Sequence, residues 1–145
     1  MSMLLDDIRR EIVDLHVFFT DWFNGKADRS KLDECFISRL HPELIFIPPE
    51  GNVLRAAQLK AGFEQSYGAN PGFRIQIRDV EIHHDLGDHI LATYSERQKG
   101  AKASKHANNA RLTSVVMAKG DPMTWVHLQE TWLPEEVRAA ASFDF

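Results

Sequence analysis

The period of the hydrophobic pattern changes once along the chain, at Asn70-Pro71-Gly72, and this change constrains the fold more than any other feature. Before it, apolar residues recur every three or four positions, most clearly between Leu4 and Phe23, which is typical of a helix with one buried face. After it, apolar and polar residues alternate, which is typical of strands. Early helices followed by hairpin-linked strands predict an α+β domain with helices on one face of a bent antiparallel sheet.

Capping and turn residues set the boundaries of the expected elements. We expect helices over residues 4–23, 30–38 and 54–67, and strands over residues 44–47, 73–83, 90–98, 111–119 and 125–133. The apolar parity of the strand over 73–83 shifts beside Arg78-Asp79, which predicts a β-bulge. The basic segment 99–106 is expected to be a long flexible hairpin loop. Residues 1–134 then form one domain, and residues 135–145 form a tail that either frays or packs Phe143 or Phe145 onto the body.

Composition argues against several classes of function. The chain has 145 residues, with 17 Lys and Arg against 21 Asp and Glu and a formal net charge of −4. It therefore lacks the basic surplus that favours nucleic acid or an anionic membrane surface. No apolar run approaches the roughly 20 residues that cross a bilayer, and no signal-like segment opens the chain. We expect a cytoplasmic protein with neither nucleic acid nor membrane as a partner. Seven histidines and one cysteine show no metal-ligand spacing, so we expect no metal and no cofactor.

Two stretches of sequence stand out: Phe46-Ile47-Pro48-Pro49-Glu50-Gly51, and the strand Trp125-Val126-His127-Leu128-Gln129-Glu130-Thr131-Trp132. Together with the order of elements, they resemble the nuclear transport factor 2-like superfamily, which includes SnoaL-like polyketide cyclases, ketosteroid isomerases and the association domain of calcium/calmodulin-dependent kinase. The resemblance implies a cystatin-like roll: a cone-shaped curved sheet, antiparallel with a mixed edge, wrapped around three N-terminal helices. It also implies a pocket at the open end and a homodimer formed through the outer sheet face.

The residues that carry ketosteroid isomerase chemistry are missing from this chain. Pro48 stands where those enzymes have an aspartate general base, and Phe18 or Phe19 stands where they have the tyrosine of the oxyanion hole. Neither replacement moves or donates a proton. Isomerase chemistry by that route is therefore not expected.

The family's inward strand parity, carried onto this chain, gives candidate pocket residues. In the strand over 111–119 it places Leu112, Ser114 and Val116 inward, and in the strand over 125–133 it places Val126, Leu128, Glu130 and Trp132 inward. The candidate ligand-binding residues are Phe19, Trp22, Phe46, Phe63, Tyr94, Glu96, Ser114, Glu130 and Trp132. A few polar groups in an aromatic cavity are the usual composition of a small-molecule site. The alternative is that the aromatic residues are core and that Glu130 pairs with Arg97 or Arg111.

Two carboxylates in one such cavity cannot both stay ionised cheaply, because burial or repulsion raises at least one pKa. Glu130 or Glu96 is therefore a candidate proton carrier, and Glu130 and Tyr94 are the candidate catalytic residues. We favour a homodimer that binds a small, partly aromatic or hydroxylated molecule. The alternatives are an acid–base enzyme of cyclase, hydratase or isomerase type, and an assembly module like the kinase association domain. The row His127, Gln129 and Thr131 is expected to face outward, toward a partner copy.

Overall fold

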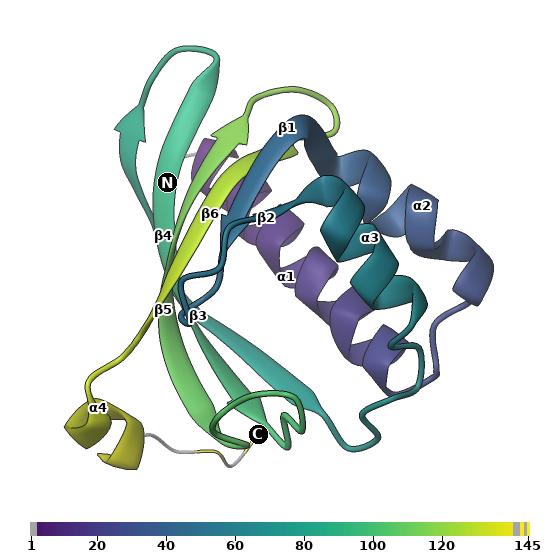
Figure 1. Cartoon of the computed structure of the whole chain (residues 1–145). Helices are drawn as coiled ribbons and strands as arrows, with labels where there is room; N and C mark the ends of the chain where they lie inside the picture. The colour runs from purple at the N-terminus through teal and green to yellow at the C-terminus, as the bar shows by residue number, and fades with distance from the viewer. Residues whose placement is uncertain (1–2, 141–142, 144) are drawn as a thin grey trace.

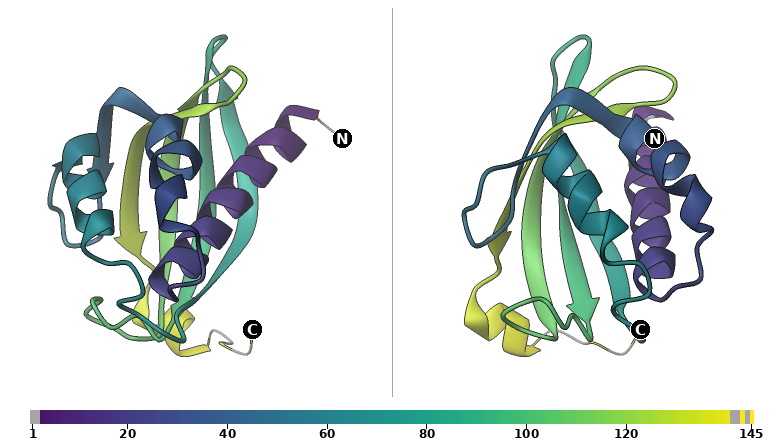
Figure 2. Two further views of the ribbon diagram at one scale, coloured as in Figure 1. Left: turned by 90° about the vertical axis from the view of Figure 1, so that its right-hand side faces the viewer. Right: turned by 45° about the vertical axis from the view of Figure 1, so that its right-hand side comes forward.

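The computed structural model describes residues 3–140, 143 and 145, and it shows helices on the concave face of a curved six-stranded sheet (Figure 1). The helices are α1 (Met3–Phe23), α2 (Leu32–Cys35), α3 (Ala56–Glu64) and α4 (Glu135–Ala140), with 3₁₀ turns at Arg29–Lys31 and Ile37–Arg39. The strands are β1 (Leu40–Ile47), β2 (Leu54–Arg55), β3 (Arg74–Asp85), β4 (His89–Lys99), β5 (Asn109–Ala118) and β6 (Thr124–Trp132). The expected α+β class is confirmed: the sheet curls around the helices and is not closed into a barrel (Figure 2).

The strand order, β2-β1-β6-β5-β4-β3, combines a meander with a mixed edge. β3 to β6 are joined as antiparallel neighbours, whereas β1 runs parallel to β6 and pairs on its other side with the short β2. The two stretches that carry the family resemblance are thereby brought together, with Phe46 of β1 paired with Leu128 of β6.

Irregularities in β3 bend the sheet. Its pairing with β4 shifts between Arg78 and Glu81 and again between Ile82 and His84. Asp79 has a left-handed φ of 56°, a conformation that Asp tolerates better than most residues. The β-bulge expected beside Arg78-Asp79 is therefore confirmed. Because bulges bend and twist a strand, they help β3 to curl toward α1, against which it packs.

The segment between α1 and β1 differs from the helix expected over residues 30–38. A single helical turn lies between two 3₁₀ turns, and Phe36 leaves the helical region with a φ of −127°. Phe36 is buried against other phenylalanines, so tertiary packing overrides the local helical pattern here. β1 then begins at Leu40, four residues before its expected start, and includes Pro42 in a stretch where its pairing with β6 is irregular, a position that suits proline.

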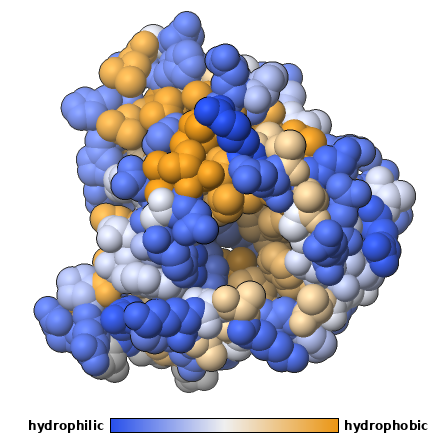
Figure 3. Space-filling model, in the orientation of Figure 1, coloured by the Kyte–Doolittle hydropathy of each residue, from blue (hydrophilic) through white to orange (hydrophobic). Residues whose placement is uncertain are grey.

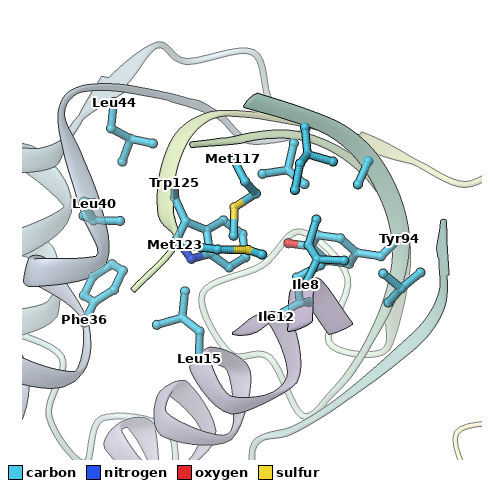
Figure 4. Packing of buried hydrophobic residues seen from close by; sticks show 14 of the residues in the cluster. Ile8, Ile12, Leu15, Phe36, Leu40, Leu44, Tyr94, Met117, Met123 and Trp125 are labelled. Carbon is cyan, nitrogen blue, oxygen red and sulfur yellow. The ribbon is translucent and has the colours of Figure 1, made fainter. Parts of the chain in front are cut away.

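The main core lies between α1 and the part of the sheet near the hairpin that joins β3 to β4 (Figure 4). Ile8 and Ile12 of α1 have no exposed surface, and they face sheet residues that include Met117 and Trp125. This is the apolar stripe that the period of 3.6 predicts. Among the described helices, none is both long and apolar enough to span a membrane.

The C-terminal tail contacts the body through its last residue. Lys99 donates a hydrogen bond from Nζ to the backbone oxygen of Phe145, and its ammonium lies 5.0 Å from the centroid of the Phe145 ring. Of the two alternatives for this segment, packing of Phe145 onto the body is therefore the one observed.

Candidate functional site

The inner face of β4, β5 and β6 changes from apolar to polar along the strands. Cross-strand pairing arranges its side chains in rows: Ile90, Met117 and Trp125; Ala92, Val115 and Leu128; Tyr94, Thr113 and Glu130; Glu96, Arg111 and Trp132; then Gln98 and Asn109. The first two rows belong to the apolar core or pack against it. The polar rows follow toward the hairpin that joins β4 to β5, at the end where the helices diverge from the sheet (Figure 1).

A cavity of about 180 Å³ lies between these rows and the helices. In the space-filling view the molecule is hollowed between the sheet and the helices, with hydrophobic residues bordering the hollow (Figure 3). Six phenylalanines line the cavity, and we call them the aromatic wall: Phe19, Phe23, Phe36, Phe46, Phe63 and Phe73. Phe63 is central to this wall, since its ring centroid lies 4.5 Å from that of Phe36 and 5.0 Å from that of Phe19.

Opposite the aromatic wall lies a hydrogen-bonded network of seven side chains, which we call the polar cluster: His16, Glu96, Gln98, Asn109, Arg111, Thr113 and Glu130. At one end, His16 Nε2 lies 3.1 Å from Glu96 Oε1. Gln98 donates from Nε2 to the other oxygen of Glu96, Oε2, over 2.6 Å. Both carboxylate oxygens of Glu96 therefore have partners inside the protein.

Arg111 is the centre of the polar cluster. Its Nη1 donates to Glu130 Oε1 over 3.0 Å, and its Nη2 donates to Gln98 Oε1 and to Asn109 Oδ1, each over 3.0 Å. The guanidinium carbon lies 4.8 Å from the ring centroid of Trp132, so the cation also stacks on an aromatic face. Only a small part of the Arg111 surface is exposed.

His16 carries a positive charge in this arrangement. Its Nδ1 lies 2.7 Å from the backbone oxygen of Ile12 and its Nε2 faces the carboxylate of Glu96, so both ring nitrogens meet acceptors. Neutral imidazole has only one N–H, whereas the imidazolium has two. Burial alone lowers the pKa of His16, but the charge and hydrogen bond of Glu96 outweigh burial and raise this pKa above its ordinary value. The ring therefore has no free lone pair with which to act as a base.

The two carboxylates of the cluster titrate in opposite directions. Burial works against ionisation of Glu96, but the charges of His16 and Arg111 outweigh it and lower the pKa of Glu96 to about 2. Burial and the negative charge of Glu96 raise the pKa of Glu130 to about 7, against the attraction of Arg111. Thr113 also donates to Glu130, from Oγ1 to Oε2 over 3.3 Å. Glu130 is thus the carboxylate of the cluster that exchanges a proton near neutral pH.

Tyr94 lies between the polar cluster and the core. It is 1% exposed, lines the cavity, and its hydroxyl has no hydrogen-bond partner that meets ordinary geometry among the described residues. Burial raises the pKa of Tyr94 well above its ordinary value, so the phenol stays protonated.

One solved structure decides the family. It is an NTF-2-like protein of unknown function from Pseudomonas aeruginosa, 31% identical in sequence, with a TM-score of 0.79 over 88% of this chain and 99% of that chain. The chain belongs to the nuclear transport factor 2-like superfamily.

More distant solved structures share the nuclear transport factor 2-like fold. An NTF2-like protein from Cytophaga hutchinsonii is 16% identical, with a TM-score of 0.65 over 92% of this chain and 100% of that one. A putative calcium/calmodulin-dependent protein kinase type II association domain from Thiobacillus denitrificans is 18% identical, with a TM-score of 0.61 over 87% of this chain and 94% of that one. No protein-family model and no curated protein matches the sequence.

In this nuclear transport factor 2-like protein, most of the candidate site residues come together. Those that line the cavity are Phe19, Phe46, Phe63, Tyr94, Glu96 and Glu130. The two alternatives for Glu130 were a place in the cavity and an ion pair with an arginine. Both are observed, because Glu130 pairs with Arg111 and both residues line the cavity.

Three candidate site residues lie outside the cavity lining. Trp22 is core: it is 2% exposed, packs edge-to-face on Tyr67 and donates from Nε1 to the backbone oxygen of Phe63. Trp132 lies in the row of Glu96 and Arg111, but it packs against the guanidinium of Arg111 and does not itself line the cavity. Ser114 lies on the outer face of the sheet, because its neighbour Thr113 is the buried residue that faces Glu130.

The error at Ser114 concerns the parity of the whole of β5. From Arg111 onward, the buried residues are Arg111, Thr113, Val115 and Met117, whereas Leu112, Ser114 and Val116 are exposed or half-buried. In β6, the pairing shifts between Trp125 and His127, so Val126 is the extra residue of a bulge and Trp125 points inward in its place. Beyond the bulge the expected parity holds, with Leu128 and Glu130 inward and Gln129 and Thr131 exposed.

Sequence reasoning missed His16, Gln98 and Arg111 as site residues. His16 follows Ile12 and precedes Phe19 on the buried stripe of α1, a spacing that could have marked it as an inward-facing histidine. Arg111 could have been found only from the register, which places it directly opposite Glu96. Among the described residues, no group of three or more His, Cys, Asp and Glu side chains is arranged to hold a metal.

Proposed function

We propose that this protein binds a small, partly aromatic or hydroxylated molecule in the cavity. The observation that carries the proposal is the pairing of an aromatic wall with a buried polar cluster across a single space. Apolar walls with a few fixed polar groups are the usual composition of a small-molecule site. An apolar cavity of roughly 150 Å³ holds a benzene ring, so a space of about 180 Å³ suits a one-ring molecule with a small substituent.

Burying the charged groups of the polar cluster does not add to the stability of the fold, and this supports a role for the cluster in binding. Replacing a buried ion pair by well-packed apolar residues is often neutral or stabilising, so stability alone does not require Arg111 and Glu130. Protein interiors also contain few voids larger than a water molecule. A buried ion pair beside a void of this size fits a site shaped for a ligand better than it fits a core.

Native mass spectrometry of freshly purified protein, followed by denaturing release, tests the proposal. We expect either a bound molecule of small mass or an empty protein that takes up a one-ring probe such as 4-ethylphenol. Leu59→Trp, which fills the cavity from α3, should abolish both, whereas Leu86→Trp at an exposed hairpin tip should abolish neither. An empty protein that takes up no probe contradicts the proposal.

We also propose that two copies pair through the outer face of β4, β5 and β6. Side chains at the centre of this face carry no carboxylate, lysine or arginine: Leu91, Thr93, Ser95, Leu112, Ser114, Val116, His127, Gln129 and Thr131. Interface centres are depleted in such charges. Leu112 is 37% exposed there. We expect analytical ultracentrifugation to give a dimer that Leu112→Lys converts to a monomer, with Leu86→Lys as the matched control. A wild-type monomer contradicts pairing, and a larger ring favours the assembly alternative.

An acid–base enzyme is the second candidate, favoured by one observation. Glu130 lines the cavity with a pKa of about 7, and an acid or base that titrates near the working pH is effective in proton transfer. In this function Glu130 moves the proton and Tyr94 donates a hydrogen bond. Mass spectrometry of a metabolite mixture incubated with the wild type should then show a conversion that Glu130→Gln abolishes. Turnover that survives Glu130→Gln would remove this candidate.

A further inference from the structure

We propose that the cavity selects neutral, hydroxyl-bearing ring molecules and disfavours carboxylates of the same shape, because the polar cluster is already balanced in charge and offers the ligand one donor beside one acceptor. This inference rests on the proposed binding function and specifies its ligand class.

The charge balance follows from the groups that line the cavity. His16 of α1 and Arg111 of β5 are the cations, and Glu96 of β4 and Glu130 of β6 are the anions. Tyr94 is the remaining titratable side chain of the lining, and it is neutral. The described residues of β1, β3 and α3 that line the cavity are all apolar. With Glu130 ionised, the two positive and two negative charges cancel and leave no cation for a ligand anion.

The hydrogen bonds of the cluster leave a donor and an acceptor side by side. A guanidinium has five N–H groups. In Arg111, Nε and Nη2 bond to Asn109 and Gln98, and Nη1 bonds to Glu130. The second hydrogen of Nη1 has no partner in the described part of the chain. Glu130 Oε1, which accepts from Nη1, keeps a free lone pair. A hydroxyl fits this pair because it donates to Glu130 and accepts from Arg111.

A carboxylate lacks the hydrogen that Glu130 requires and adds a buried negative charge close to two others. It binds without that repulsion only when Glu130 takes up a proton, because the cluster then has a net positive charge. Binding of a carboxylate is therefore linked to protonation of Glu130, whereas binding of a hydroxyl is not.

Two one-ring probes of similar size, 4-ethylphenol and 4-ethylbenzoate, test the inference in titrations at pH 6, 7 and 8. The phenol stays neutral over this range, as tyrosine does, and the benzoate stays ionised. With the pKa of Glu130 at about 7, the protonated fraction rises roughly tenfold from pH 8 to pH 6. We expect benzoate affinity to rise roughly tenfold over the same interval and phenol affinity to change less than about threefold.

Glu130→Gln should remove the selectivity, because residue 130 is then neutral at every pH and the charges of His16 and Arg111 are opposed by Glu96 alone. We expect this variant to bind 4-ethylbenzoate at least about tenfold more tightly than the wild type at pH 8, without the pH dependence. Glu64→Gln, at an exposed position on α3, is the matched control and should behave as the wild type. If Glu130→Gln does not fold, the pH series of the wild type decides alone.

The outcomes separate this inference from the proposed function. Equal affinity of the wild type for both probes at pH 8, or a benzoate affinity that does not change with pH, overturns the charge selection while leaving ring binding intact. Failure of the wild type to bind either probe at any pH overturns the proposed function and this inference together.

Discussion

Replacing Glu130 by Gln should remove a pH dependence of stability that the wild type carries. The pKa of Glu130 is raised from an ordinary 4.5 to about 7, so between these values the folded state holds a proton that the unfolded chain has released. Stability contributed by a raised carboxyl pKa is present at low pH and is lost as pH rises through the folded value. Wild-type stability should therefore fall from about pH 5 to about pH 8.

The magnitude follows from the same two pKa values. Since one pH unit corresponds to about 1.4 kcal/mol for one proton, ionising Glu130 in the folded state costs roughly 3 kcal/mol more than in the unfolded chain. Between pH 5 and pH 8 the free energy of unfolding of the wild type should fall by roughly 2 to 3 kcal/mol relative to Glu130→Gln. This difference is a large share of the stability of an ordinary small domain.

Urea denaturation at pH 5, 6, 7 and 8, followed by tryptophan fluorescence, measures the difference. Glu64→Gln is the matched control and should run parallel to the wild type. His16 titrates in all three proteins, and the charge of Glu130 is the smallest of the causes that raise its pKa, so the difference between the curves comes mainly from Glu130. If the curves of the wild type and Glu130→Gln also run parallel, Glu130 titrates in the folded state as it does in the unfolded chain, and the polar cluster does not raise its pKa.

Two further changes test other parts of the structure. Glu96→Gln removes the charge and the hydrogen bond that keep the buried ring of His16 protonated, so His16 should lose its proton, and we expect a cost of about 1 to 3 kcal/mol at pH 7, measured by urea denaturation. It should also reduce the loss of stability that the wild type suffers as pH falls from 4.5 toward 2, because the pKa of Glu96 is lowered. Asp28, Asp85 and Asp88 also have lowered pKa values and keep part of this loss, so an acid loss as large as that of the wild type would contradict the role of Glu96. Trp22→Ala should destabilise by about 3 to 5 kcal/mol while leaving the affinity for 4-ethylphenol unchanged at a temperature where the variant is folded, because Trp22 packs in the core and not in the cavity. Weakened binding in the folded variant would contradict this and indicate that Trp22 is part of the binding site.

Secondary structure was predictable where one hydrophobic period, 3.6 for a helix or 2 for a strand, continues through a long segment. α1 and the four strands of the meander lie within a few residues of the expected ranges, and even the bulge beside Asp79 shows as a shift in apolar parity. The helix expected over residues 30–38 is shorter than predicted and ends at Cys35, because Phe36 turns to pack on Phe63, a contact made across the fold. The two-residue β2 is too short to have a period of its own.

The site was less predictable, because it depends on register. Arg111 and Thr113 are polar residues on the buried face of β5, so the apolar alternation that marks an inner face is inverted there. Their burial makes sense only once Glu96 and Glu130 are known to lie opposite them. Whether an aromatic residue lies in the core or borders the cavity likewise depends on how the elements pack and not on its spacing along the chain. Trp22 and Phe19 share a helix stripe, but only Phe19 borders the cavity.

A crystal of the protein soaked with 4-bromophenol tests the central claim most directly, because bromine is located by its anomalous scattering. The structure predicts one strong bromine peak in the cavity among Phe19, Phe63 and Phe46, with the hydroxyl within hydrogen-bond distance of Glu130 and Arg111. A bromine peak only on the outer surface, or a filled cavity in which the hydroxyl points away from Glu130, would contradict the account.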